Sequence, residues 1–253
     1  MNRFIDYAAL VFAFSFFVLW LSARVGAFLR RKRNLEQNMR DDFSTILLAT
    51  LTLNGLIIGF SFSMAITRYD QRKNYEEAEA NAIGTELVRA GLLPPADATT
   101  VRALLSNYLD QRISFYRSRD AQQLRQINTR TAQLQYDLWS AVQPPATAQP
   151  NPVLALVVSG MNDVLNSQGY TQAAWWNRIP HAAWVLMVVL AICCNLLVGY
   201  GARTTKRRGL LLILPLILSI AFMLIADIDS PRVGFVHVAP QNLLSLSASM
   251  PAH

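Results

Sequence analysis

Residues Phe43–Ile66 read FSTILLATLTLNGLIIGFSFSMAI and contain no charged side chain. An α-helix needs about 20 mostly apolar residues to cross the hydrocarbon core of a bilayer, and this stretch meets that length. Three other stretches of the chain are similar in length and character: Phe4–Ala23, Ala182–Tyr200 and Leu210–Ile228. The sequence therefore predicts an all-α integral membrane protein with four transmembrane helices.

The four apolar stretches form two pairs, and a long polar segment separates the pairs. This layout predicts transmembrane helices 1 and 2 within residues 1–67, a helical soluble domain over 68–180, transmembrane helices 3 and 4 within 181–229, and a C-terminal tail over 230–253. Such a composition, with 53% hydrophobic and 15% charged residues, is too apolar for a soluble protein of this size.

The polar segment has helix-forming composition and apolar residues at helical spacing. We expect the second span to continue to Leu92, and three further helices: one from about Asp97, one over 121–142, and one over Val153–Gln168. Because Pro lacks the N–H that a helix needs, the Pro-rich run 144–152 predicts a linker. Gly169 predicts the end of the last helix. Trp175, Trp176 and Trp184 near the third span are typical of residues at a membrane surface.

Two short loops carry the whole net charge of +7. Residues 24–42 hold six basic and three acidic side chains, and residues 203–208 hold four basic side chains and no acidic one. Lys and Arg in short loops beside transmembrane helices stay on the cytoplasmic side. We therefore expect a multi-pass protein of the bacterial cytoplasmic membrane whose helical insert and both termini are extracytoplasmic. No aromatic or glycine pattern accompanies the basic runs, so nucleic acid is not an expected partner.

Catalytic and metal-binding motifs are not found in the sequence. The chain has no Gly-rich phosphate loop, no zinc-ligand spacing and no nucleophile elbow, and its three histidines are far apart. The two cysteines, Cys193 and Cys194, are adjacent within the third span, which predicts packing residues. We expect no enzyme activity, no cofactor and no metal site.

The second span carries the most specific pattern. Gly55, Gly59 and Ser63 recur every four residues and form a nearly bare helix face, which allows close packing against another helix. A mixed stripe lies beside this face; its apolar members are Ile58, Phe62 and Ile66, and its polar members are Asn54 and Ser61. One interpretation is packing within one subunit, with a stripe that faces lipid. The other is an oligomer in which Ile58, Phe62 and Ile66 form an apolar constriction, with Asn54 and Ser61 wetting the path.

Acidic residues occur in two places. Asp227 and Asp229 close the fourth span, and because carboxylates at a membrane are costly, they form a candidate ion site. The alternative is that the span simply ends there. The acidic and basic residues that follow the second span predict a solvated, salt-bridged helix face: Arg72, Lys73, Glu76, Glu77, Glu79, Glu86 and Arg89.

Two segments resemble signatures of the bacterial bestrophin-like domain-of-unknown-function family. The first combines GFSFSMAITRYD at Gly59–Asp70 with EANAIGT at Glu79–Thr85 and Leu92-Leu93-Pro94. The second is DSPRVGF at Asp229–Phe235. The resemblance extends from about Phe43 to about Val238.

This resemblance implies a relation to bestrophins, which are pentameric anion channels with an apolar neck lined by helices. Phe62 with Ile58 and Ile66 is similar to such a neck. Bestrophins hold their soluble domain and both termini in the cytosol, whereas the loop charges here predict the opposite orientation. The sequence thus favours a homo-oligomeric channel in the lipid bilayer that passes small anions. The alternative is a membrane-anchored sensor or scaffold whose helical insert binds a partner.

Overall fold

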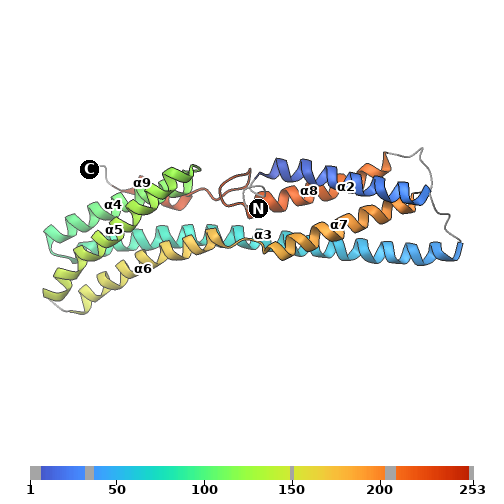
Figure 1. Cartoon of the computed structure of the whole chain (residues 1–253). Coiled ribbons are helices and arrows are strands. Elements are labelled where there is room, and N and C mark those ends of the chain that lie inside the picture. Colours follow the sequence, from blue (N-terminus) through green and yellow to red (C-terminus); the bar gives the residue numbers. More distant parts are fainter. Residues whose placement is uncertain (1–6, 32–36, 149–150, 203–208, 251–253) are drawn as a thin grey trace. The chain divides into compact units, whose positions relative to one another are not determined.

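The structure is a computed structural model that describes residues 7–31, 37–148, 151–202 and 209–250 (Figure 1). The chain divides into two compact units. Unit 1 comprises Met1–Tyr69 and Arg178–His237, and unit 2 comprises Asp70–Asn177 and Val238–His253. Most of the basic residues on which the expected orientation depends, within 32–36 and 203–208, lie outside the described residues.

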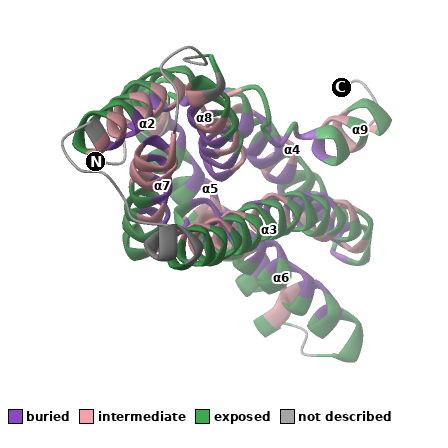
Figure 2. Cartoon of the chain, turned by 90° about the vertical axis from the view of Figure 1, so that its right-hand side faces the viewer, coloured by how far each residue is buried: buried purple, intermediate pink, exposed green. Residues whose placement is uncertain are grey.

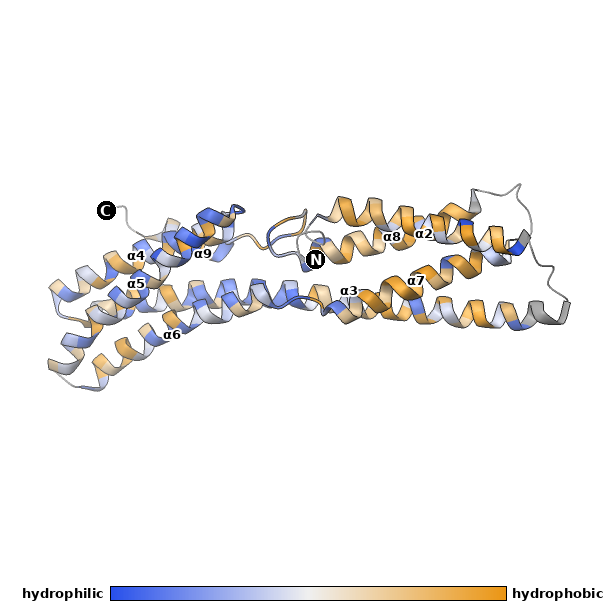
Figure 3. Ribbon diagram, viewed as in Figure 1, coloured by the Kyte–Doolittle hydropathy of each residue, from blue (hydrophilic) through white to orange (hydrophobic). Residues whose placement is uncertain are grey.

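Unit 1 is built from long apolar helices. It contains α2 (Ala8–Arg31), the first part of α3 (Gln37–Arg89), α7 (His181–Gly201) and α8 (Leu210–Asp229). Figure 3 shows apolar residues along α2, α7 and α8. Within the described residues, four helices are long and apolar enough to cross a membrane. The structure thus confirms the expected helical architecture, with four helices that have the length and composition of membrane spans.

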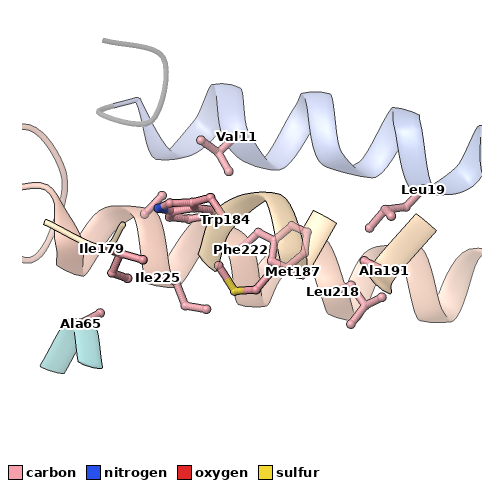
Figure 4. Packing of buried hydrophobic residues seen from close by; sticks show 11 residues of the cluster. Val11, Leu19, Ala65, Ile179, Trp184, Met187, Ala191, Leu218, Phe222 and Ile225 are labelled. Carbon is pink, nitrogen blue, oxygen red and sulfur yellow. The ribbon is translucent and has the colours of Figure 1, made fainter. Parts of the chain in front are cut away.

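The core of unit 1 lies where these helices face one another. Figure 4 shows Trp184 and Met187 of α7 beside Phe222 and Ile225 of α8, with Val11 of α2 near them. Ala65 is the residue of α3 that belongs to this buried cluster.

The closest helix packing in unit 1 joins α2 to α7. A Cβ atom on Gly26 would collide with the backbone carbonyl of Leu196, and one on Gly199 would collide with the carbonyl of Ala23. Small residues at such crossings let two helix backbones approach. Arg30 of α2 adds a cap, because its guanidinium donates to the carbonyl oxygens of Tyr200 and Gly201 at 3.0 and 3.3 Å.

Unit 2 is a bundle of amphipathic helices. After the second part of α3 come the 3-10 turn η1 (Ala90–Leu92), then α4 (Pro95–Arg117), α5 (Ala121–Ala148) and α6 (Pro152–Trp176). The C-terminal part of the chain contributes α9 (Gln241–Ser249), which packs against α4. The apolar side of α5 is buried and has helical spacing, with Ile127, Leu134, Leu138 and Val142 in the core.

Two helix ends in unit 2 differ from the sequence prediction. The expected linker at 144–152 is wrong for its first half, because α5 continues through Pro144 and Pro145 to Ala148. Each proline removes only one backbone hydrogen bond of the helix, and in the last turn the Thr147 hydroxyl donates to the Gln143 carbonyl at 3.0 Å. The expected stop at Gly169 is also wrong. A helical glycine costs only about 1 kcal/mol, and the turns beyond it bury Thr171 and Trp175.

Trp175 is a core residue and not a membrane anchor. Its side chain is 4% exposed, and its ring lies edge-on to Phe115 and Tyr116 of α4 at centroid distances of 5.1 and 5.5 Å. Trp184 is likewise buried, against Phe222 in unit 1. Trp176 is 75% exposed, so of the three tryptophans it alone has the exposure that an interfacial anchor needs.

Candidate functional site

Helix α3 is the least buried of the membrane-spanning helices. Only 6% of its most apolar window is buried in the chain, against 39% of the corresponding window of α8. Figure 2 shows exposed residues along α3. In unit 1, a narrow stripe that includes Asn54, Ser61 and Ala65 is buried, and the remaining surface of the helix is open.

The three residues of the expected constriction lie on or beside this open surface. Phe62 is 37% exposed and Ile66 is 39% exposed, and the two are one helical turn apart. Ile58 lies at the edge, since it is half-buried and packs against the core of unit 1. The structure therefore places Phe62 and Ile66 together on a face that other molecules can reach.

The bare face is also open within one chain. No atom lies within 4 Å of a Cβ built on Gly55 or Gly59, and Ser63 is exposed. At 100° per residue, Gly55 and Gly59 fall on the same side of α3 as Phe62 and Ile66. Packing of this face inside one subunit, which was one interpretation of the pattern, is therefore absent from the described residues.

Asn54 and Ser61 have a different environment from Phe62. Both side chains are buried in unit 1, on the stripe that attaches α3 to its own chain. Burial within one chain can only increase when chains associate. These two residues therefore lie on a different side of α3 from Phe62 and Ile66, and their role in wetting a pathway stays a prediction.

Asp227 and Asp229 bind backbone groups of unit 1. The Asp227 carboxylate accepts from the N–H of Phe235 and of Val236, each at 2.9 Å, and the φ of +140° at Gly234 brings the loop against it. Asp229 accepts from the N–H of Ile179 at 3.1 Å and lies 3.9 Å from the Arg68 guanidinium. Asp227 thus fixes the loop after α8, and Asp229 ties the end of α8 to the turn before α7. No group of three or more potential metal ligands occurs in the described residues.

The second part of α3 holds a row of buried charged residues that was expected to be solvated. Arg72, Glu76, Glu79 and Glu86 are all buried in unit 2, so the expected salt-bridged surface is wrong for them, whereas Glu77 is exposed. Their spacing, together with Ile83 and Ala90, alternates between four and three residues. That heptad-like spacing marks one face of a helix and could have revealed the row.

Glu79 is the centre of a buried network. Its carboxylate pairs with Arg112 of α4 and accepts from the hydroxyls of Tyr116 and Thr171 at 3.3 and 3.2 Å. Burial, and then the negative charge of Glu79, raise the pKa of Tyr108 and of Tyr116 above the ordinary value, so both phenols stay neutral. These contacts tie α3, α4 and α6 together.

Neighbours of Glu79 on the same helix make separate contacts. Arg72 donates to the carbonyls of Ala174 and Asn177 at the end of α6, each at 3.3 Å. Glu76 accepts from the N–H of Asn242 and of Leu243, at 2.9 and 3.0 Å, at the start of α9. Buried charges with such partners avoid much of the desolvation cost.

The family of this protein is shown by a match that extends over most of the chain. A family model described as "Bestrophin-like domain" matches residues 9–243. The chain belongs to the bestrophin-like domain family. The family match covers all four membrane-spanning helices, all of unit 2 up to Trp176, and the start of α9. A search of curated proteins gives no match.

Solved structures share the fold of this chain. A bacterial bestrophin homologue from Klebsiella pneumoniae is 14% identical, with a TM-score of 0.65 over 94% of this chain and 99% of that chain. A point variant of that homologue gives 12% identity and a TM-score of 0.62 over 93% of this chain and 98% of that one. A variant described as a membrane protein gives 12% and 0.64, over 94% and 99%. At this identity the likeness concerns the fold.

Proposed function

We propose that this protein is an oligomeric anion channel of the bacterial cytoplasmic membrane, with α3 beside the pathway. The observation that carries the proposal is the open face of α3, which bears Phe62 and Ile66 on a membrane-spanning helix that its own chain barely covers. Membership of the bestrophin-like family supports it further. A single chain with four spans has no room for a pore, so several copies must place α3 around an axis.

In this proposal Ile58, Phe62 and Ile66 form the constriction. Apolar side chains one turn apart form successive rings around the axis, and such rings gate a pore by excluding water when it is narrow. Gly55, Gly59 and Ser63 lie on the same side of α3 and have little or no side-chain bulk. They let the α3 helices of neighbouring copies approach closely.

The partners of the channel are the lipid bilayer, further copies of the chain and small anions. Because the basic loops hold the net charge, we propose that they face the cytoplasm and that unit 2 and both termini are extracytoplasmic. Asp227 and Asp229 have structural roles here and are not required to bind an ion. Neither a reaction nor a cofactor is part of the proposal.

The test is flux through the purified protein in liposomes, with chloride and potassium measured against empty vesicles. Chloride-selective flux would support the channel. If the protein is folded and oligomeric but gives no flux at any pH or calcium concentration, the channel proposal fails, and a sensor or scaffold takes its place.

Replacing Phe62 with Ala tests the constriction. We expect Phe62→Ala to raise chloride flux several-fold, because a wider apolar ring is a lower barrier to a hydrated ion. The matched control is Phe60→Ala, since Phe60 is also exposed on α3 but points to a nearly opposite side of the helix. Equal flux in the wild type and in folded Phe62→Ala would rule out Phe62 as part of the barrier.

A further inference from the structure

Glu86 differs from the other buried carboxylates of unit 2. Its side chain is 0% exposed, and neither carboxyl oxygen has a hydrogen-bond partner among the described residues. Glu76 and Glu79 are equally buried, but backbone amides, an arginine and hydroxyl groups donate to them. An ionised carboxylate without such donors is very costly in the interior of a protein. The surroundings of Glu86 thus fit a neutral carboxyl group.

The carboxyl group of Glu86 occupies the place of a missing side chain on α6. A Cβ atom built on Gly160 would collide with Oε2 of Glu86, and it would also meet the guanidinium of Arg89. Gly160 is itself buried. At Gly160, the contact between α3 and α6 is therefore made by a titratable group seated directly on a glycine.

The charged groups that act on Glu86 come from α3 and α6, and they do not cancel the effect of its burial. Burial is the main cause that raises the pKa of Glu86, to about 8; Arg89 on α3 lowers it and Asp163 on α6 raises it again. On α4, Arg102 donates from Nε to the carbonyl of Leu87 at 3.5 Å. No ion pair of Glu86 is found among the described residues.

We propose that Glu86 is a proton-binding site that controls the packing of α3 against α6. With the proton bound, the neutral carboxyl group rests on Gly160 and the two helices pack together. When the proton leaves, the carboxylate must be hydrated, and α6 loosens from α3 around Gly160. Unit 2 would then respond to pH near neutrality, which is a property beyond the proposed transport and independent of it.

The sign of the pH dependence follows from proton linkage. An unfolded Glu releases its proton above its ordinary pKa of 4.5, whereas folded Glu86 keeps it until about pH 8. Between these values the folded state binds more protons than the unfolded state, so stability falls as pH rises. The contribution of Glu86 is fully present below pH 4.5 and is lost progressively up to about pH 8.

Thermal unfolding of the full-length protein in detergent, from pH 5 to pH 8.5, tests the proposal. We expect Glu86→Gln to match the wild type near pH 5 and to unfold several degrees higher at pH 8, because Gln has no proton to lose. The matched control is Glu77→Gln, since Glu77 is exposed on the same helix and its replacement should leave the wild-type pH slope unchanged. The same slope in the wild type and Glu86→Gln overturns the proposal.

Two further measurements keep the proposal testable if Glu86→Gln does not fold. The infrared C=O stretch of a protonated carboxyl group should be present in the wild type at pH 7 and disappear above pH 8. Hydrogen exchange, corrected for the intrinsic effect of pH, should speed up in the segment 154–164 of α6 over the same range. A wild-type protein with no protonated carboxyl group at pH 7 overturns the assignment.

Discussion

Two glycines of α6 show how strongly the effect of a substitution depends on the surroundings of the residue. Gly160 is covered by Glu86 and Arg89, whereas Gly169 has no atom within 4 Å of a built Cβ. Both lie inside the helix, so both lose the same backbone entropy on folding. Any difference between Ala substitutions at these two sites therefore reports packing and not helix propensity.

We expect Gly160→Ala to destabilise the protein by about 1–3 kcal/mol, because the new methyl group must displace the Glu86 carboxyl group from its buried position. Gly169→Ala should instead stabilise it by about 0.5–1 kcal/mol, as Ala does at an open helix position. Chemical denaturation of both variants in the same detergent checks this. A Gly160→Ala variant as stable as Gly169→Ala would mean that α6 is not packed against Glu86.

At the scale of elements, α9 is held chiefly through its first turn. The Glu76 carboxylate accepts from two backbone N–H groups of that turn, and from the side-chain amide of Asn242 at 2.6 Å. A negative charge at a helix N-terminus is favourable because it satisfies free N–H groups and opposes the helix dipole. Leu246, further along α9, lies against Gly84 of α3. The C-terminal segment is thus an integral part of unit 2.

Glu76→Gln should weaken the attachment of α9 by about 1–2 kcal/mol, since the neutral amide loses charge-assisted hydrogen bonds and presents an N–H group to Asn242. Hydrogen exchange of the segment 241–249 should speed up about 5- to 30-fold, while exchange in α5 stays unchanged. Protection of α9 equal to that of the wild type would show that Leu243 and Leu246 are sufficient to hold it.

At the scale of the whole molecule, orientation in the membrane is set by charge and not by fold. Helices of one architecture can be inserted either way, and short loops rich in Lys and Arg decide which side remains cytoplasmic. Bestrophins have their soluble domain in the cytosol, whereas the charge placement in this chain predicts the opposite orientation. The side of the membrane on which unit 2 lies can be measured directly.

Fusions after His253 test this orientation. We expect alkaline phosphatase fused there to be active and green fluorescent protein to be dark, because the C-terminus is predicted to be extracytoplasmic. Neutralising the four basic residues at 203–208 should reduce phosphatase activity several-fold at equal expression. A bright fluorescent fusion with an inactive phosphatase would place unit 2 in the cytosol, as in bestrophins.

Sequence patterns of short range determined the four membrane-spanning helices and the helical nature of unit 2. Apolar length and helical spacing are properties of neighbouring residues, and the bilayer thickness gives them a fixed scale. The same holds for the grouping of Gly55, Gly59, Phe62 and Ile66, because these residues fall on one side of any helix built from this stretch. The composition alone did not reveal which faces are covered.

Only the tertiary structure decided burial and helix ends. Glu76, Glu79 and Glu86 look like surface residues in the sequence, but all three are buried. Their surroundings differ, because α9 and α4 bring hydrogen-bond donors to the first two, whereas α6 brings Gly160 against the third. Gly169 is a helix breaker by local rules, yet contacts with other helices bury Thr171 and Trp175 in the turns beyond it. Pro144 also lies inside a helix, α5, against the same local rules. Gly26 and Gly199 are 173 positions apart in the sequence, and their role in close helix packing is seen only where α2 crosses α7. The sequence fixes local propensity, but the free energy of burying a group depends on what the fold places against it.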